Sequence, residues 1–464
     1  MSHAASSPVD SKLKPEPARP PVHSPLSHAT ASQPTPAASL PTELLLRIFE
    51  LMPMMYAGEV REDLVAWTVS STCPDLPKVA RVCRGWRRAA QLSLFHSVSL
   101  VRRKQVDGFI ETVTSRPDLA QRVTALHIGL IRGTPEHSSP YARQVDLSDR
   151  LTEALALCVN VRHLVVNQMR LGTKYRFVDV LERLPLVSLL LKLYDPGTED
   201  GLDTGIFTVP SDVYRAFSLP ELRNFELNFR PTWARHSNYL VPVVESHVEN
   251  MSVTVNAPRG LTPMLSAAGA NLVRLNIYTE HVLDPDAAIA AFSTLVNLRE
   301  FRLESTVASQ TPRLPAVAAL AGGGGRTNGP GPSAAGAGDR NDWLEALLPL
   351  YTKLQRLSIS EQAASAGFLR LLAPSVEVAE YISWDARPDS VLEQLEAVLR
   401  GPAPPGVGLR LPGLVVLAVD EEAFEGTVDD DKLAQVTDAF RTKGTEFRVA
   451  FEPMEIPGLR WVDM

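Results

Sequence analysis

Hydrophobic side chains recur at helical spacing in a first stretch near the start of the chain, LPTELLLRIFELM. Pro41 suits the first turn of a helix, because the amide hydrogen that proline lacks would have no partner there. Pro53 is expected to end the helix. The pattern predicts one helix with an apolar stripe along it, formed by Leu44, Leu45, Ile48, Phe49 and Met52.

A second apolar stripe follows in VARVCRGWRRAA, and the chain then continues with the apolar segment LFHSVSL. The opposite face of this predicted helix carries arginines. The stripe consists of Val79, Val82, Cys83, Trp86, Ala89 and Ala90. We interpret residues 38–100 as a small unit of packed helices.

Beyond residue 100 the hydrophobic pattern changes. Short apolar clusters of the form L-x-x-L-x-L replace the helical spacing. Several successive clusters begin about 24 to 26 residues apart, within the range of leucine-rich repeats. The clusters are Val123/Leu126/Ile128, Val161/Leu164/Val166, Leu186/Leu189/Leu191, Leu222/Phe225/Leu227, Val248/Met251/Val253, Leu272/Leu275/Ile277, Leu298/Phe301/Leu303, Leu354/Leu357/Ile359 and Leu414/Leu417/Val419, with a weaker one at Val376/Ala379/Tyr381.

Amphipathic helical segments lie between these clusters, for example DAAIAAFSTLVNL and DSVLEQLEAVL. One strand and one helix cannot bury their apolar faces alone, so neighbouring units must stack. We therefore expect an α/β fold in which residues 101–464 form a leucine-rich-repeat-like β/α solenoid. The repeats are degenerate, because the asparagine usual after the last leucine is absent, and a terminal strand is expected around Phe447 and Val449.

Two segments have the composition of unstructured chain. Residues 1–37 are rich in proline, serine and alanine without periodic apolar positions, which predicts a disordered tail. Residues 321–340 are rich in glycine, alanine and proline, which predicts a flexible insertion in the array.

Composition narrows the functional classes. The 464 residues carry a formal net charge of -7, which disfavours nucleic acid and anionic membranes as partners. The three cysteines, Cys73, Cys83 and Cys158, lack metal-ligand spacing, and no signal peptide or membrane-spanning run is apparent. We expect a cytoplasmic or nuclear protein.

Sequence motifs of catalysis are missing from the chain. The glycine-rich segment is not followed by the Gly-Lys pair of a phosphate-binding loop, and no His-Glu-x-x-His zinc motif occurs. A Gly-x-Ser-x-Gly nucleophile elbow is also absent. The sequence therefore predicts a protein without catalytic residues, metal or cofactor.

LPTELLLRIF, followed by VARVCRGWRRAA and LFHSVSL, resembles an F-box, although the interval between the two halves is longer than usual. The resemblance implies a three-helix unit that binds the Skp adaptor and, through it, a cullin. By the same resemblance, the adaptor contacts are Leu40, Pro41, Leu44, Ile48, Val82, Cys83 and Trp86. The alternative is that this stripe only forms the core of a small helical domain.

The resemblance implies the substrate-recognition subunit of an SCF-type ubiquitin ligase, acting in ubiquitin-dependent protein degradation with an unknown protein substrate. An interaction scaffold without a role in turnover is the alternative.

In each predicted strand the residues beside the inward leucines face the other side of the sheet. The expected substrate contacts there are Asn224, Glu226, Asn228, Arg274, Asn276, Tyr278, Glu300, Arg302, Glu304 and Arg356.

Overall fold

The computed structural model describes most of the region in which the sequence predicts helices and strands. The described ranges are 40–56, 76–100, 103–128, 140–167, 177–192, 210–229, 245–255, 258–279, 285–305, 342–364, 366–383, 388–401, 410–419 and 429–451. The predicted tail at 1–37, the interval 57–75 and the predicted insertion at 321–340 lie outside these ranges.

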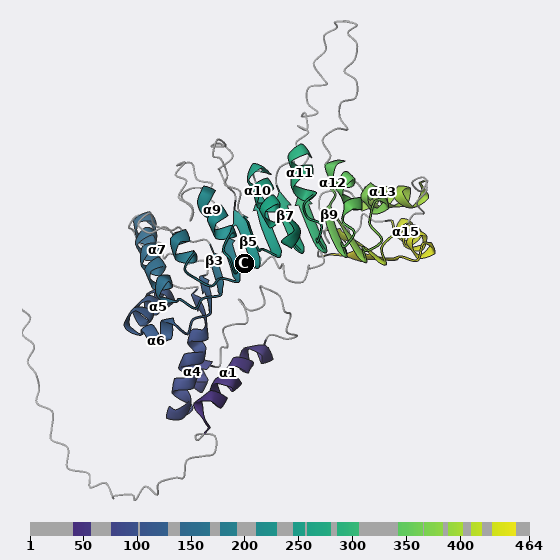
Figure 1. Ribbon diagram of the computed structural model, residues 1–464. Coiled ribbons are helices and arrows are strands. Elements are labelled where there is room, and N and C mark those ends of the chain that lie inside the picture. Colours follow the sequence, from purple (N-terminus) through teal and green to yellow (C-terminus); the bar gives the residue numbers. More distant parts are fainter. Residues whose placement is uncertain are drawn as a thin grey trace, which may run out of the picture.

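Within the described ranges, one parallel sheet of twelve strands runs through the molecule, and the order of the strands in the sheet is their order in the chain (Figure 1). The strands are β1 (Ser97–Leu100), β2 (Ala125–Ile128), β3 (His163–Asn167), β4 (Ser188–Lys192), β5 (Asn224–Phe229), β6 (Asn250–Val255), β7 (Arg274–Thr279), β8 (Glu300–Ser305), β9 (Arg356–Ser360), β10 (Val378–Ser383), β11 (Leu414–Val419) and β12 (Glu446–Ala450). The protein is thus an α/β protein, as the sequence predicts.

Helices lie between most successive strands, along one face of the sheet (Figure 1). They are α5 (Arg103–Ser115), α6 (Pro117–Ala120), α7 (Pro140–Leu157), α8 (Phe177–Leu181), α9 (Pro210–Phe217), α10 (Pro258–Ala268), α11 (Pro285–Phe292), α12 (Asp342–Leu347), α13 (Pro388–Arg400) and α15 (Asp430–Thr442). Short 3-10 helices are η3 (Gly269–Asn271), η5 (Leu348–Leu350) and η6 (Ala366–Arg370).

The core lies between the helices and the inward face of the sheet and forms one continuous apolar cluster from Leu100 to Phe447. Every cluster predicted from Val123 to Tyr381 is buried in it, as expected for alternating strand positions. The last predicted cluster is shifted by two residues. Leu414 pairs with the outward residue Val378 and is not in the core, whereas Val415, Leu417 and Val419 face inward. β11 is apolar throughout, so alternation does not set its frame.

A separate, smaller core belongs to the N-terminal helices α1 (Thr42–Tyr56), α3 (Leu76–Val79) and α4 (Arg84–His96). Leu45 and Phe49 of α1 pack there with Ala89 and Ala90 of α4. The prediction that Pro53 ends the first helix is wrong, because α1 continues to Tyr56. Pro53 lacks one backbone hydrogen-bond donor, and the helix continues for three further residues despite this loss.

Helix α4 leads directly into β1, so the expected 38–100 unit contains the first strand of the sheet. Leu94 packs against the small helical core, whereas Phe95, the next residue, packs against the core of the sheet. One continuous helix therefore joins the two cores.

Candidate functional site

An exposed apolar stripe runs along α1 and the residues before it. Leu40, Leu44 and Ile48 follow each other at four-residue spacing, and their relative exposures are 36%, 53% and 47%. The adjacent residues Leu45 and Phe49 are each only 1% exposed, because they face the helical core. Both faces of the start of α1 are thus apolar, and only one of them is buried.

Further predicted adaptor contacts lie at the turn between α3 and α4. Val82, in this turn, is 63% exposed. Cys83 is the half-buried N-cap residue of α4, and Pro41 is exposed at the start of α1. We call Leu40, Leu44, Ile48 and Val82 the exposed apolar set. Large exposed side chains of this kind, gathered on one small unit, are typical of a protein-binding surface.

Trp86 differs from the other predicted adaptor contacts. Its ring meets that of Phe49 edge to face, with the centroids 5.9 Å apart, and the side chain packs against the helical core. Helical periodicity places Trp86 on the same stripe as Val82 and Cys83, so the sequence alone does not separate core from surface here. A change at Trp86 would disturb the packing of α1 on α4.

The predicted substrate contacts lie on the outer face of the sheet, opposite the helices, in three rows set by the strand register. Asn224, Arg274, Glu300 and Arg356 occupy the first strand position, and Glu226, Asn276 and Arg302 the third. Tyr278 and Glu304 take the fifth position with Asn228, whose side chain lies outside the described part.

Most of these outer-face side chains are engaged with one another. Asn250 donates a hydrogen bond to Asn224 (2.6 Å), which donates to Ser188 (3.0 Å). Arg274 pairs with Glu300 at 3.4 Å. Three members are almost fully buried, namely Glu226, Asn276 and Arg302, and Arg302 also pairs with Glu304. Arg356, in contrast, is exposed. The outer face is therefore mostly a structural hydrogen-bonding layer.

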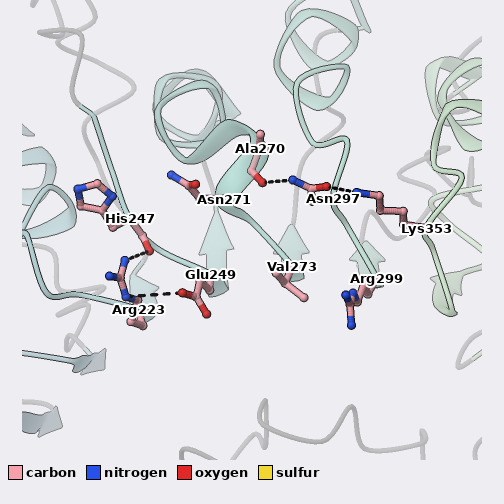
Figure 2. A pocket seen from close by; sticks show the side chains of 9 residues that line it. All are labelled: Arg223, His247, Glu249, Ala270, Asn271, Val273, Asn297, Arg299 and Lys353. Atoms are coloured by element: carbon pink, nitrogen blue, oxygen red, sulfur yellow. Dashed lines mark hydrogen bonds and ion pairs between the residues drawn. The ribbon is translucent and has the colours of Figure 1, made fainter.

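A pocket of about 320 Å³ lies instead at the amino-terminal edge of the sheet, which the sequence prediction missed (Figure 2). Its lining includes Arg223, His247, Glu249, Asn297, Arg299 and Lys353. Three of these, Arg223, Glu249 and Arg299, each directly precede the first residue of a strand. The available signal was this recurrence of charged residues one position before the predicted strands.

The described residues contain no group of three or more histidine, cysteine or acidic side chains placed to hold a metal ion. Burial raises the pKa of the Cys158 thiol to about 12, so this cysteine is not an activated nucleophile. Burial, with smaller effects of Arg162 and His96, lowers the pKa of His163.

In the described part of the chain, no helix combines the length and apolar character that a membrane span requires.

The sequence matches no protein-family profile and no curated protein. The functional argument therefore depends on the geometry of the exposed apolar set and of the sheet.

Proposed function

We propose that the chain is a substrate-recognition subunit of an SCF-type ubiquitin ligase, with the helices of residues 38–100 as an F-box and the sheet and its helices as a leucine-rich-repeat-like solenoid. The exposed apolar set supports this proposal. Leu44 and Ile48 are about half exposed to water, although the opposite face of α1 is buried against α4. Because about half of each side chain is already buried, covering the rest with the Skp adaptor would gain roughly 0.8 to 1.5 kcal/mol for each.

The proposed mechanism is proximity. The adaptor and its cullin hold a ubiquitin-charged enzyme at one end, and the array holds a protein target, so the target's local concentration beside that enzyme rises. The continuous connection from α4 into β1 suits this role, because it fixes the direction in which the array leaves the helical unit. The strand order, which follows the chain without exception, supports the solenoid interpretation.

The test is co-purification of the full-length chain with the Skp adaptor. Leu44→Asp combined with Ile48→Asp places two charges in the apolar set, and we expect the adaptor affinity to fall at least about 100-fold. Because both side chains are exposed, the fold should survive, and circular dichroism and thermal unfolding check this. Trp86→Ala is unsuitable, because Trp86 packs in the helical core.

The matched control is Val296→Asp combined with Leu350→Asp. These side chains are 52% and 56% exposed, close to the values at Ile48 and Leu44, but they belong to the array. Adaptor binding should be unchanged in the control. If the wild-type chain does not bind the adaptor, or if both double variants lose it equally, the proposal is wrong.

The second candidate function is a scaffold that binds the adaptor and a partner without promoting turnover of the partner. Both functions use the same exposed set, so binding does not separate them. The half-life of a captured partner in cells distinguishes the two functions. It should lengthen in cells that carry Leu44→Asp with Ile48→Asp if the chain is a ligase subunit, and stay constant if it is a scaffold.

A further inference from the structure

The pocket at the amino-terminal edge of β5 to β9 contains cationic side chains that neighbouring carboxylates do not neutralise (Figure 2). Arg223 is the exception, because it lies 3.6 Å from Glu249 and donates to the carbonyl of His247 at 3.0 Å. Neither Arg299 nor Lys353 has an ion-pair partner among the described residues. Lys353 donates to the Asn297 amide oxygen, which leaves two of its three ammonium hydrogens.

Hydrogen bonds between loops hold the wall of this pocket. The Asn271 amide donates to the carbonyl of Ser246 at 2.9 Å, and the Asn297 amide donates to that of Ala270 at 2.6 Å. Each asparagine thus ties the loop before its strand to the preceding loop. Lys353 continues the series by binding Asn297. The cations therefore project from a preformed edge, which limits the entropy lost when a ligand binds.

The charge of the pocket is opposite to that of the chain. Arg223, Arg299 and Lys353 face one carboxylate, Glu249, so the lining has a formal charge of +2 with His247 neutral. The whole chain has a formal charge of -7. Two cations without an ion pair among the described residues, Arg299 and Lys353, favour an anionic ligand in this concave site. The planar guanidinium of Arg299 suits a carboxylate or a phosphate in two-bond geometry.

The shape of the site favours an extended ligand. The lining continues from the start of β5 to the loop before β9, which is four strand spacings, or about 19 Å. A small anion could contact Arg299 and Lys353, which precede the neighbouring strands β8 and β9, but it would not also reach Arg223 at the start of β5. An extended peptide of about six residues covers the same 19 Å, at roughly 3.3 Å per residue. A peptide with several acidic groups therefore matches both the length and the charge of the pocket.

We propose that this edge, rather than the outer face of the sheet, binds an extended protein segment carrying several oxyanion groups. The oxyanions are carboxylates of aspartate and glutamate or phosphates of modified serine and threonine. Arg299 and Lys353 are the central binding residues. That this segment belongs to a ubiquitination target depends on the proposed function, whereas the binding itself does not.

The test uses purified full-length chain without adaptor and two fluorescent eight-residue peptides, one rich in glutamate and one with phosphoserines at the same positions. Fluorescence anisotropy should detect binding of at least one of them, weakening as salt rises because the contacts are electrostatic. Arg299→Glu combined with Lys353→Glu should raise the dissociation constant of that peptide at least about tenfold. The two peptides distinguish carboxylate from phosphate recognition.

Lys443→Glu is the matched control, since Lys443 is an exposed lysine between α15 and β12, three strands beyond the end of the pocket and not part of its lining. It should leave the dissociation constant unchanged. Tyr278→Ala tests the outer face. The proposal is overturned if neither peptide binds at about 1 mM, if the double variant binds as the wild type does, or if Tyr278→Ala alone removes binding. Displacement of the peptide by equimolar inorganic phosphate would indicate a small-anion site and would also overturn it.

Discussion

At the scale of single residues, the two described cysteines have contrasting surroundings. Cys158 is fully buried after α7, where its thiol donates to the carbonyl of Ala154 at 3.4 Å and its pKa is raised to about 12 by burial. Cys83 is half-buried at the start of α4, next to the exposed Val82. Thiol reactivity requires both access and the thiolate form, so the two residues should differ strongly.

We predict that N-ethylmaleimide at pH 8 modifies Cys83 of the native chain and leaves Cys158 unmodified until the protein is denatured. The background is Cys73→Ser, because Cys73 lies outside the described residues. Peptide mass spectrometry gives the extent of modification. Saturation with the Skp adaptor should protect Cys83 if the proposed interface is correct. Equal rates at Cys83 and Cys158 in the native chain would contradict the packing around α7.

The exposed apolar set also shows how far residue-level prediction reaches. The sequence identified Leu44, Ile48 and Val82 as candidate contacts, and their exposure agrees with that role. It placed Trp86 with them, although Trp86 packs on Phe49. Helical periodicity shows which residues share one face of a helix. Which of those residues are buried depends on the elements that pack against that face. The adjacent pairs Leu44/Leu45 and Ile48/Phe49 were the useful sign that α1 has two apolar faces.

At the scale of elements, α12 is the first helix after residues 306–341, which lie outside the described part of the chain. It continues the array between β8 and β9. Trp343 of α12 packs on Phe292 of α11 with 4.9 Å between ring centroids, and Phe292 also meets Phe301 of β8 at 5.7 Å. The Tyr351 hydroxyl donates to the carbonyl of Phe292 at 3.1 Å. Together with the pairing of β8 and β9, these contacts keep the core continuous here.

We predict that Trp343→Ala lowers the free energy of unfolding by about 3 to 5 kcal/mol, because it leaves a large cavity between α11 and α12. Tyr351→Phe removes only one hydrogen bond and should cost about 1 kcal/mol. Urea unfolding followed by circular dichroism measures both. A Trp343→Ala effect no larger than that of Tyr351→Phe would contradict the packing of Trp343 in the core.

Element-level prediction succeeded where alternation was strong. In β7, Leu275 and Ile277 alternate with polar residues, and the predicted frame is correct. In β11 every position is apolar, and the frame was predicted two residues late. The burial of Arg302 and Glu226 was not predictable, because it depends on lateral partners that the strand pattern does not specify. The edge pocket likewise depends on loops of several units meeting at one edge.

At the scale of the whole molecule, the sheet is a linear series in which each strand pairs with its chain neighbours. The helical unit is joined to the first strand, and the edge pocket begins four strands later. With about 4.8 Å between strands, the pocket lies roughly 19 to 38 Å along the sheet from β1. The two proposed binding sites are thus separate, and each should work without occupancy of the other.

A linear series of contacts also predicts local unfolding. In such an array a destabilised unit disturbs mainly its neighbours, because distant units share no contacts with it. Leu164→Ala in β3 should therefore accelerate amide hydrogen exchange in β2 to β4 and leave β9 to β12 near the wild-type rate, and Leu417→Ala in β11 should do the reverse. Both leucines are fully buried in the same continuous core, so the comparison is matched. If either substitution accelerated exchange uniformly along the chain, the sheet would unfold as one cooperative unit, and the independence of the edge pocket from the N-terminal helices would no longer follow.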